Sequence, residues 1–417
     1  MKTGDFSFLR FLLLIVILSD SHAFAAVTSV HPPGENLKQA IANANPYDTL
    51  LVQPGNYHVE MIDINKPLVL LGVDYPVLDS QNGDEIIVVT SDSVTISGFQ
   101  LQNIGVSFIK DRAAIRLNRV GHVTVEDNIL LNTFFGIYLQ YSTDCIVKNN
   151  RILGSATDEV RAGNAIHIWK GTRILVANNT LTGHRDGIYF EFVDNSLISG
   201  NTSENNFRYG LHFMFSNNDI YEDNIFKHNG AGVAVMFSKE IEMTNNLFEE
   251  NWGGASYGLL LKEISDGKLS GNTFHRNTIG IYAEGANRIH IRNCRFVGNG
   301  QAMDIKGNCL DNEIIGNDFI GNTFEVITNT KQNRNYFDGN YWSQYRGYDL
   351  DRNGVGDVPH RPVNLFALIT QNIPAASMLL HSFLINSLDA AERIFPQLIP
   401  EHLVDENPSM KPVVAHD

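Results

Sequence analysis

Residues 210–236 read GLHFMFSNNDIYEDNIFKHNGAGVAVM, and this stretch contains one full period of a repeat that runs through most of the chain. The glycine that opens it, Gly210, returns 22 residues later as Gly232, and Asn224 lies between them. The same asparagine recurs every 22 to 29 residues, at Asn128, Asn150, Asn179, Asn201, Asn224, Asn246, Asn272 and Asn317, with Cys294 in the one gap. Self-similarity at this period is typical of a stacked repeat protein.

Each repeat also contains a short β-prone run that begins with glycine or alanine. In Gly210–Met214 the first and third residues after the glycine are large and apolar, whereas the second and fourth positions of such runs are mixed. Alternation with a period of two places the first set inside a coil and the second outside. A coil of about 22 residues cannot bury its own apolar face, but coils stacked ~4.8 Å apart share one core. The sequence therefore predicts an all-β, right-handed parallel β-helix with hydrogen-bonded asparagines at a left-handed corner.

The N-terminal residues differ from the repeats. Residues 1–25 have a charged start, an apolar stretch and a small-residue cleavage site, which together predict a signal peptide and export. The apolar stretch is too short to span a bilayer. Residues 35–45 carry apolar residues at helical spacing, so we expect a short helix that caps the first coil. We expect the β-helix to occupy residues 26–335, with the repeat fading after Asn322.

Two segments of different character follow the repeats. Residues 336–362 are rich in turn-forming and aromatic residues, and residues 363–417 lack the rhythm of glycine and asparagine. Large apolar residues at helical spacing over 364–403 predict a partly helical, amphipathic tail. The density of these residues favours docking on a partner over a simple cap.

Composition narrows the possible functions. The chain of 417 residues has a formal net charge of −15 and no basic patch or RNA-binding motif, which argues against nucleic acid as a partner. Its three cysteines, Cys145, Cys294 and Cys309, indicate no disulfide framework, so we expect structural thiols. The sequence after the signal shows neither a Walker motif nor a membrane span, so any ATP-driven step would belong to a partner.

The outward positions of the repeated strand form two columns on one face. This predicted binding face contains Tyr138, His167, Trp169, Tyr189, Glu191 and Tyr282. A soluble protein rarely exposes aromatic side chains so densely unless they bind something, although the tail or a coil insertion could also cover them.

Three residues of this face suggest a copper site. His212 and Met214 point the same way on one strand, and Met236 lies beside Met214 in the next coil. Imidazole and thioether groups are ligands that suit Cu(I), and His167 and Glu191 could add further donors. The alternative is that the methionines serve packing.

A carbohydrate site is the competing hypothesis for the same face. Tyrosine, tryptophan and the carboxylates of Asp186, Glu191 and Glu284 resemble what sugar-binding β-helices display. Glycoside hydrolysis needs two carboxylates at a defined separation, but Glu191 and Glu284 lie four coils, roughly 19 Å, apart. Asp186 and Glu191 belong to one coil, and the sequence does not show whether they converge.

A calcium loop is suggested by residues 349–357, which read DLDRNGVGD. Oxygen side chains at Asp349, Asp351, Asn353 and Asp357, together with the backbone carbonyl of Val355 and a central glycine, match the first nine positions of a calcium-binding loop. His360 stands where the bidentate glutamate would be. The alternative is an ordinary turn held by side-chain-to-backbone bonds.

Several of these strings together resemble the NosD family. They are RDGIY (185–189), RYGLHFM (208–214), YGLLLK (257–262) and NYWSQYRGYDLD (340–351), and the resemblance covers nearly the whole chain after the signal. It implies a periplasmic accessory protein for maturation of the copper enzyme nitrous oxide reductase. The implied partners are an ABC transporter permease and its ATPase, a copper chaperone lipoprotein and the reductase itself. The resemblance supplies no copper ligands, so His212, Met214 and Met236 stay a hypothesis from position and ligand type. We expect a binding and docking protein that is not an enzyme.

Overall fold

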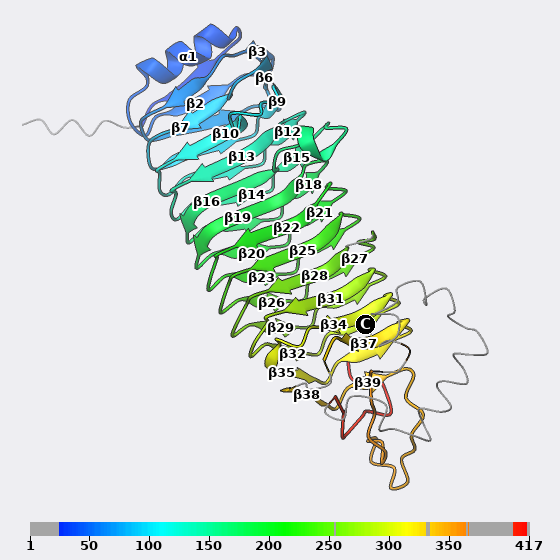
Figure 1. The fold of residues 1–417 in the computed structure, drawn as a ribbon. Helices are drawn as coiled ribbons and strands as arrows, with labels where there is room; N and C mark the ends of the chain where they lie inside the picture. The colour runs from blue at the N-terminus through cyan, green and yellow to red at the C-terminus, as the bar shows by residue number, and fades with distance from the viewer. Residues whose placement is uncertain (1–24, 254–255, 331–333, 364–365, 367–402, 415–417) are drawn as a thin grey trace, which may run out of the picture.

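The computed structural model describes residues 25–253, 256–330, 334–363, 366 and 403–414. The predicted signal peptide lies outside these residues, as does nearly all of the predicted helical tail. Three parallel sheets run the length of the molecule and form one elongated, three-sided tube (Figure 1). Structures of this kind are parallel β-helices, so the predicted fold class is confirmed.

Each sheet takes one short strand from each coil. The 12-stranded sheet consists of β4 (Ile62–Ile64), β7 (Ile87–Val89), β10 (Ala113–Asn118), β13 (Phe135–Gln140), β16 (Ile166–Thr172), β19 (Asp186–Asp194), β22 (Tyr209–Met214), β25 (Ala231–Met236), β28 (Tyr257–Lys262), β31 (Ile279–Glu284), β34 (Gln301–Ile305) and β37 (Phe324–Thr328). The 14-stranded sheet consists of β1 (Val27–Val30), β2 (Thr49–Val52), β5 (Leu68–Gly72), β8 (Val94–Ser97), β11 (Thr124–Glu126), β14 (Ile146–Lys148), β17 (Leu175–Ala177), β20 (Leu197–Ser199), β23 (Ile220–Glu222), β26 (Glu242–Thr244), β29 (Lys268–Ser270), β32 (His290–Arg292), β35 (Leu310–Ile315) and β38 (Arg334–Asp338). The 13-stranded sheet consists of β3 (Asn56–His58), β6 (Val77–Gly83), β9 (Gln100–Ile104), β12 (Ile129–Leu131), β15 (Arg151–Leu153), β18 (Thr180–Thr182), β21 (Thr202–Glu204), β24 (Ile225–Lys227), β27 (Leu247–Glu249), β30 (Thr273–His275), β33 (Arg295–Val297), β36 (Asp318–Ile320) and β39 (Tyr341–Trp342).

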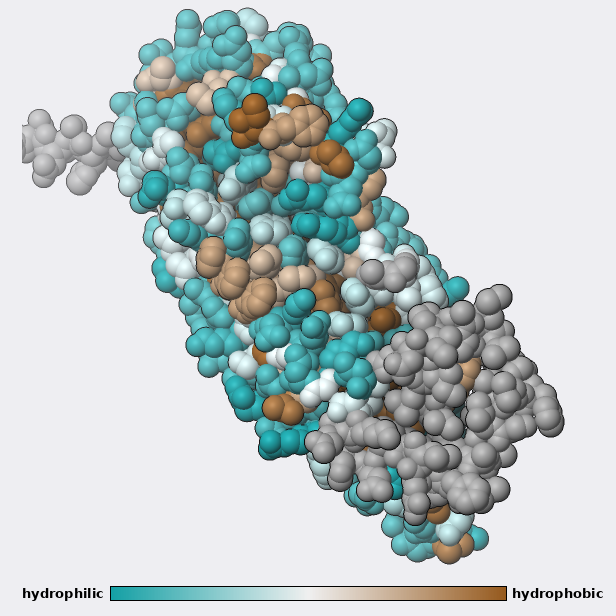
Figure 2. All heavy atoms as spheres, viewed as in Figure 1, coloured by the Kyte–Doolittle hydropathy of each residue, from teal (hydrophilic) through white to brown (hydrophobic). Residues whose placement is uncertain are grey.

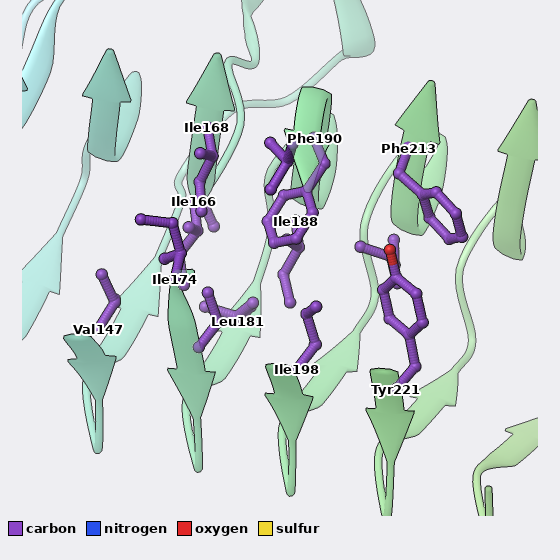
Figure 3. Close-up of a cluster of buried hydrophobic side chains, with 14 of the residues drawn as sticks. Val147, Ile166, Ile168, Ile174, Leu181, Ile188, Phe190, Ile198, Phe213 and Tyr221 are labelled. Carbon is purple, nitrogen blue, oxygen red and sulfur yellow. The ribbon is translucent and has the colours of Figure 1, made fainter. Parts of the chain in front are cut away.

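The core is a column of apolar side chains shared by all coils. Ile188, Phe190 and Phe213 from the 12-stranded sheet meet Leu181 and Ile198 from the other two sheets inside the tube (Figure 3). Inward phenyl rings of successive coils also stack, as at Phe274 and Phe296, whose centroids lie 4.8 Å apart with planes at 7°. The spacing of these rings equals the spacing of the strands, because each coil lies directly on the one before it.

The asparagine column forms the predicted ladder of amides. The backbone N–H and the side-chain Nδ2 of Asn201 both donate to Oδ1 of Asn224, at 2.9 and 3.0 Å. Cys294 takes its expected place, because its N–H donates to Oδ1 of Asn317 at 2.8 Å. One part of the prediction is wrong: the left-handed backbone lies one residue earlier, as at Asn149 (φ 56°) before Asn150.

A second ladder follows the first around the coil. It runs through Asn206, Asn229, Asn251, Asn277, Asn299 and Asn322, with distances of 2.9 to 3.1 Å between each N–H and the next Oδ1. The two ladders fix two corners of every coil in the middle of the tube. Because these corners are fixed, the strands between them keep a constant register.

Both ends of the tube are closed. Helix α1 (Gly34–Asn43) covers the first coil with the fully or nearly fully buried side chains of Leu37 and Ile41, as predicted. At the other end, β38 and β39 continue the coils past residue 335, where we expected them to stop. Residues 403–414 then return to this end: Phe337 pairs with Asp405, and Tyr341 with Ser409, in parallel bridges. In the described part of the chain, no helix is long and apolar enough to cross a membrane.

Candidate functional site

The outward columns of the 12-stranded sheet are brought together as their register requires. Tyr138, His167, Tyr189 and His212 are consecutive partners on β13, β16, β19 and β22. Their rings form a continuous row, with centroids 4.3 Å apart between Tyr138 and His167, 4.7 Å between His167 and Tyr189, and 5.0 Å between Tyr189 and His212.

The sequence suggested that this row of rings lies on an open surface, but the structure shows that much of it is buried. Tyr138 and His212 are each only 6% exposed, and Ala234 and Leu260 in the same column are buried as well. Two insertions flank the row: residues 105–112 between β9 and β10, and residues 154–165 between β15 and β16, which include the short helix η1 (Glu159–Arg161). Their side chains turn part of the face into a groove. Partial covering of the face by coil insertions was one of the two alternatives that the sequence left open.

The groove has a volume of about 580 Å³. Its floor contains His167, Tyr189, Glu191, His212 and Met214, and its rim contains Phe108, Ile109 and Val160. The three rim side chains are 75 to 96% exposed. A polar floor with an exposed apolar rim is the arrangement expected of a site that receives a ligand or a partner.

His212 is the most unusual residue of this floor. Its Nε2 is buried and makes no hydrogen bond, whereas its Nδ1 lies 3.4 Å from Nη2 of Arg208 and 3.9 Å from Oδ2 of Asp186. A buried imidazole nitrogen without a partner is costly, because it has lost water and gained nothing in return. A ligand that reached this nitrogen would satisfy it.

Sulfur donors stand beside His212. Met214 lines the groove, and Met236 is its register partner on β25, so the two thioethers lie on neighbouring strands. Glu191 is the partner of Met214 on the other side. An imidazole nitrogen and two thioethers form a neutral, soft donor set, which fits Cu(I) better than a hard divalent cation. Within the described part of the chain, no three His, Cys, Asp or Glu side chains are placed to hold a metal ion.

The charges under the groove are balanced around one buried carboxylate. Asp186 is fully buried and accepts hydrogen bonds from Nε of Arg208 at 2.9 Å and from the N–H of Tyr209 at 3.3 Å, with Nε of Arg185 at 3.9 Å. Burial alone would raise the pKa of Asp186, but His212 and Arg208 hold it below its ordinary value. Glu191 and Asp111 also line the groove, so three carboxylates stand against two guanidinium groups and a monovalent cation does not enter a net positive site.

His167 is less suited to bind a metal together with His212. Burial lowers the pKa of its imidazole to about 3, so the ring is neutral, and its Nδ1 lies 3.1 Å from Nδ2 of Asn164. The ring of Tyr189 separates it from His212. Two coil spacings, roughly 9.6 Å, lie between the two histidines, which is too far for one ion.

Three residues of the predicted binding face lie away from the groove floor, and one of them, Tyr138, lines a neighbouring pocket with Arg116. Tyr282 lies on β31, three coils beyond His212, where its hydroxyl is 3.4 Å from Oε2 of Glu284. Trp169 faces Tyr141, with ring centroids 4.8 Å apart, and Lys170 lies over it. The structure therefore divides the predicted face and places only its central part in the groove.

Asp186, Glu191 and Glu284, the three carboxylates considered for a carbohydrate site, do not come together as a pair. Register places Glu191 and Glu284 four coils apart, with Met214, Met236 and Lys262 between them. Asp186 is enclosed and bound to Arg208, so it does not face the groove as an acid or base.

The three cysteines all lie in buried positions. Burial raises the pKa of Cys145 to about 11 and that of Cys294 to about 12, and all three thiols are buried and unpaired. Each therefore stays a protonated thiol at neutral pH.

The predicted calcium loop is held by its own backbone. Asp349 accepts hydrogen bonds from the N–H groups of Asn353 and Gly354, at 3.1 and 2.9 Å. Asp351 accepts from Asn353 at 3.2 Å, and Asn353 accepts from Val355 at 2.7 Å. Asp357 accepts from the N–H of Leu350 at 2.6 Å. These bonds are those of an asparagine- and aspartate-rich turn, and calcium ligation stays a prediction.

An exposed row of phenylalanines, not predicted from the sequence, lies beside the methionines. Phe192, Phe215 and Phe237 are 38 to 44% exposed and stack at 5.2 and 5.1 Å, each at a positive φ of 51 to 57°. Hydrophobic side chains form separate patches on a largely hydrophilic surface (Figure 2). Left-handed backbone is unfavourable for a bulky residue, so three successive phenylalanines at this corner were a signal that the sequence contained.

Comparison with known proteins supports the resemblance to the NosD family. The family model described as "Periplasmic copper-binding protein (NosD)" matches residues 77–160 and 154–347. Two curated proteins, each named "Probable ABC transporter binding protein NosD", are similar over most of their length. The one from Pseudomonas aeruginosa is 29% identical over 89% of this chain and 92% of its own. The one from Stutzerimonas stutzeri is 27% identical over 86% of each.

Solved structures of similar shape are parallel β-helices with other titles. They include the DFA-IIIase of Arthrobacter chlorophenolicus (TM-score 0.58, 13% identity, 68% of this chain and 90% of that one) and the surface adhesin PfbA of Streptococcus pneumoniae (0.54, 12%, 79% and 95%). The A-module of the mannuronan C-5 epimerase AlgE4 of Azotobacter vinelandii is another (0.51, 14%, 76% and 92%). At these identities the likeness concerns the fold alone.

Proposed function

The chain belongs to the NosD family of periplasmic copper-binding proteins, and from this premise we propose that it binds Cu(I) in the groove of its 12-stranded sheet. The proposed ligands are Nε2 of His212 and the thioethers of Met214 and Met236. The observation that carries the proposal is the buried, unpartnered Nε2 of His212, which lies on a strand whose next outward residue is a methionine. Copper is cargo here: the protein holds the ion and passes it on.

The wider role that we propose is that of a periplasmic accessory protein in the copper-site assembly of nitrous oxide reductase. The partners would be an ABC transporter permease with its ATPase, a copper chaperone lipoprotein and the reductase. The names of the two curated relatives support the link to an ABC transporter. We propose a binding and docking role without catalysis, because Asp186 is enclosed and Glu191 and Glu284 are four coils apart.

Copper binding is tested on the full chain without its signal, titrated with Cu(I) under reducing conditions against a chromophoric Cu(I) chelator. We expect the combined His212→Ala, Met214→Ala and Met236→Ala variant to lose at least tenfold in affinity. Met61→Ala and His228→Ala are matched controls, because Met61 is exposed on another coil and His228 is exposed and paired with Glu250. Equal affinity in the triple variant and the wild type would refute the proposed ligands.

Docking on the transporter is tested by a replacement that spares the closed end of the tube. Residues 367–402 are exchanged for a glycine- and serine-rich linker of equal length, and residues 403–414 stay in place. We expect purified permease to be captured by the wild type and not by this variant. Full capture by the variant would place the transporter contact elsewhere and refute docking through this segment.

A further inference from the structure

Among the described strands from β10 to β37, Asp186 is the only carboxylate at its position in the stack. The residues at this position in the other coils are all uncharged: Ala113, Phe135, Asn164, Tyr209, Ala231, Tyr257, Ile279, Gln301 and Phe324. A fully buried carboxylate is unfavourable unless charged partners satisfy it, so the fold does not need one here. Its presence only in the coil next to His212 calls for a reason tied to that histidine.

The carboxylate is held firmly and turned towards the imidazole. Arg208 grips it through Nε and Nη2, a two-point contact that fixes the plane of the carboxylate. Oδ2 then lies 3.9 Å from Nδ1 of His212, on the side of the ring opposite to the unpartnered Nε2. Arg208 also lies 3.4 Å from Nδ1, so both neighbours of this nitrogen come from one ion pair.

A histidine that binds a metal through one ring nitrogen usually donates the N–H of the other to a carboxylate or carbonyl. This second bond fixes the tautomer and the orientation of the ring, and it makes the ligating nitrogen a better donor. We propose that Asp186 is the positioning residue of the copper site: it accepts the Nδ1–H of His212, so that the lone pair of Nε2 faces the groove. Arg208 holds the carboxylate in place.

The inference rests on the proposed function, since it needs His212 to be a ligand. For this bond the imidazole would close the 3.9 Å separation to hydrogen-bond distance and give up its 3.4 Å contact with Nη2 of Arg208, which can only donate to an unprotonated Nδ1. The ring neither gains nor loses charge in this arrangement. The two neutral tautomers of the ring differ only in which nitrogen carries the hydrogen.

The test compares Asp186→Asn with Asp194→Asn, which changes the last residue of the same strand β19. Asparagine keeps the size of the side chain and one acceptor for Arg208, but it offers His212 a weaker acceptor. We expect Asp186→Asn to weaken Cu(I) binding 10- to 100-fold, and Asp194→Asn to change it less than twofold. Equal affinities of Asp186→Asn and wild type would overturn the inference.

A second measurement uses wild-type protein and does not depend on a variant that folds. The chain is labelled with ¹⁵N-histidine and loaded with Ag(I), a redox-stable stand-in for Cu(I), and the ring nitrogens of His212 are observed by NMR. We expect a protonated Nδ1 and a metal-bound Nε2. Metal on Nδ1 would overturn the role of Asp186 while leaving His212 a ligand. If the combined His212→Ala, Met214→Ala and Met236→Ala variant bound Cu(I) as tightly as the wild type, the proposed copper site itself would be refuted.

Discussion

Asp405 occupies the next rung of the asparagine ladder after Asn340. Its Oδ2 accepts hydrogen bonds from both the N–H and the Nδ2 of Asn340 at 3.0 Å, just as Oδ1 of Asn340 accepts both donors of Asn317. The same carboxylate oxygen accepts the indole N–H of Trp342 at 2.9 Å. A residue from outside the repeats thus ends the ladder and accepts the hydrogen bonds of the last coil's buried donors.

We expect Asp405→Ala to loosen this end of the tube. Three donors on Asn340 and Trp342 would be buried without an acceptor, at a cost of about 3 kcal/mol. In a stacked repeat protein, this loss is felt mainly by the terminal coils. Hydrogen exchange should therefore become faster for the amides of β38 and β39 and stay unchanged for those of β22. Asp405→Asn should do less, and the exposed Glu406→Ala should have no effect. Unchanged exchange in Asp405→Ala would show that the rung is dispensable.

An interior rung should matter more to the whole protein than the last one. Asn224 is fully buried; its Oδ1 accepts two donors of Asn201, and its Nδ2 donates to the carbonyl of Ile198 at 2.9 Å. Asn224→Ala removes all of these at once and should lower the free energy of unfolding by about 3 kcal/mol. Denaturant unfolding followed by circular dichroism measures this.

The control is Asn205→Ala, on an exposed corner of the neighbouring coil at φ 54°. We expect about 1 kcal/mol there, since only the left-handed backbone is penalised. Similar losses at both positions would mean that the ladder contributes little beyond its backbone conformation.

The sequence contained most of what determines the tube. The interval from Gly210 to Gly232 predicts the stacking, and alternation within Gly210–Met214 predicts which side chains meet inside. The second ladder, with Asn229 and Asn251, was equally periodic and could have been read from the sequence. Asp405 could not, because no period links it to Asn340, 65 residues earlier.

The groove was less predictable for a similar physical reason. The spacing placed His212, Met214 and Met236 side by side, but it said nothing of what covers them. The insertions that carry Phe108 and Val160 interrupt the repeat, so no periodic argument fixes their path. The partners of a buried charge such as Asp186 also depend on side-chain directions that a register alone does not give.

Asp219 should make the protein less stable as pH rises. Burial raises the pKa of its carboxyl from 3.8 to about 8, although the N–H of Ser196 donates to it at 2.8 Å. The unfolded chain ionises this group near pH 4, whereas the folded protein keeps it protonated to near pH 8. Its contribution is therefore fully present below about pH 4 and is lost progressively as pH rises towards 8. Asp219→Asn should raise the melting temperature at pH 7.5 and leave it nearly unchanged at pH 4.

Asp266→Asn provides a comparison of opposite sign. Arg288 lowers the pKa of Asp266, so its contribution is present at neutral pH and lost as the carboxylate is protonated in acid. This variant should lose a little stability at pH 7 and less in acid. If Asp219→Asn shifted the melting temperature equally at both values of pH, ionisation of Asp219 would not be the cause.

A metal titration distinguishes the two interpretations of the loop of residues 349–357, a calcium site and an ordinary turn. If it binds calcium, Asp349, Asp351 and Asn353 must give up the backbone N–H bonds that they now accept and turn their oxygens inward. Calcium at millimolar concentration should then raise the melting temperature of the wild type by a few degrees, as expected of a ligand that binds only the folded state. Asp351→Ala should abolish that increase and have little effect when a chelator is present.

If the loop is an ordinary turn, the wild type and Asp351→Ala should give a different result. Asp351→Ala would then cost the same stability with calcium and with chelator, since only the bonds to Asn353 are lost. Magnesium is the matched control ion, because it is smaller and fits a flexible oxygen loop poorly. A rise with calcium alone, absent from the variant, would establish the site; equal losses under both conditions would make the loop a structural turn beside the closed end of the tube.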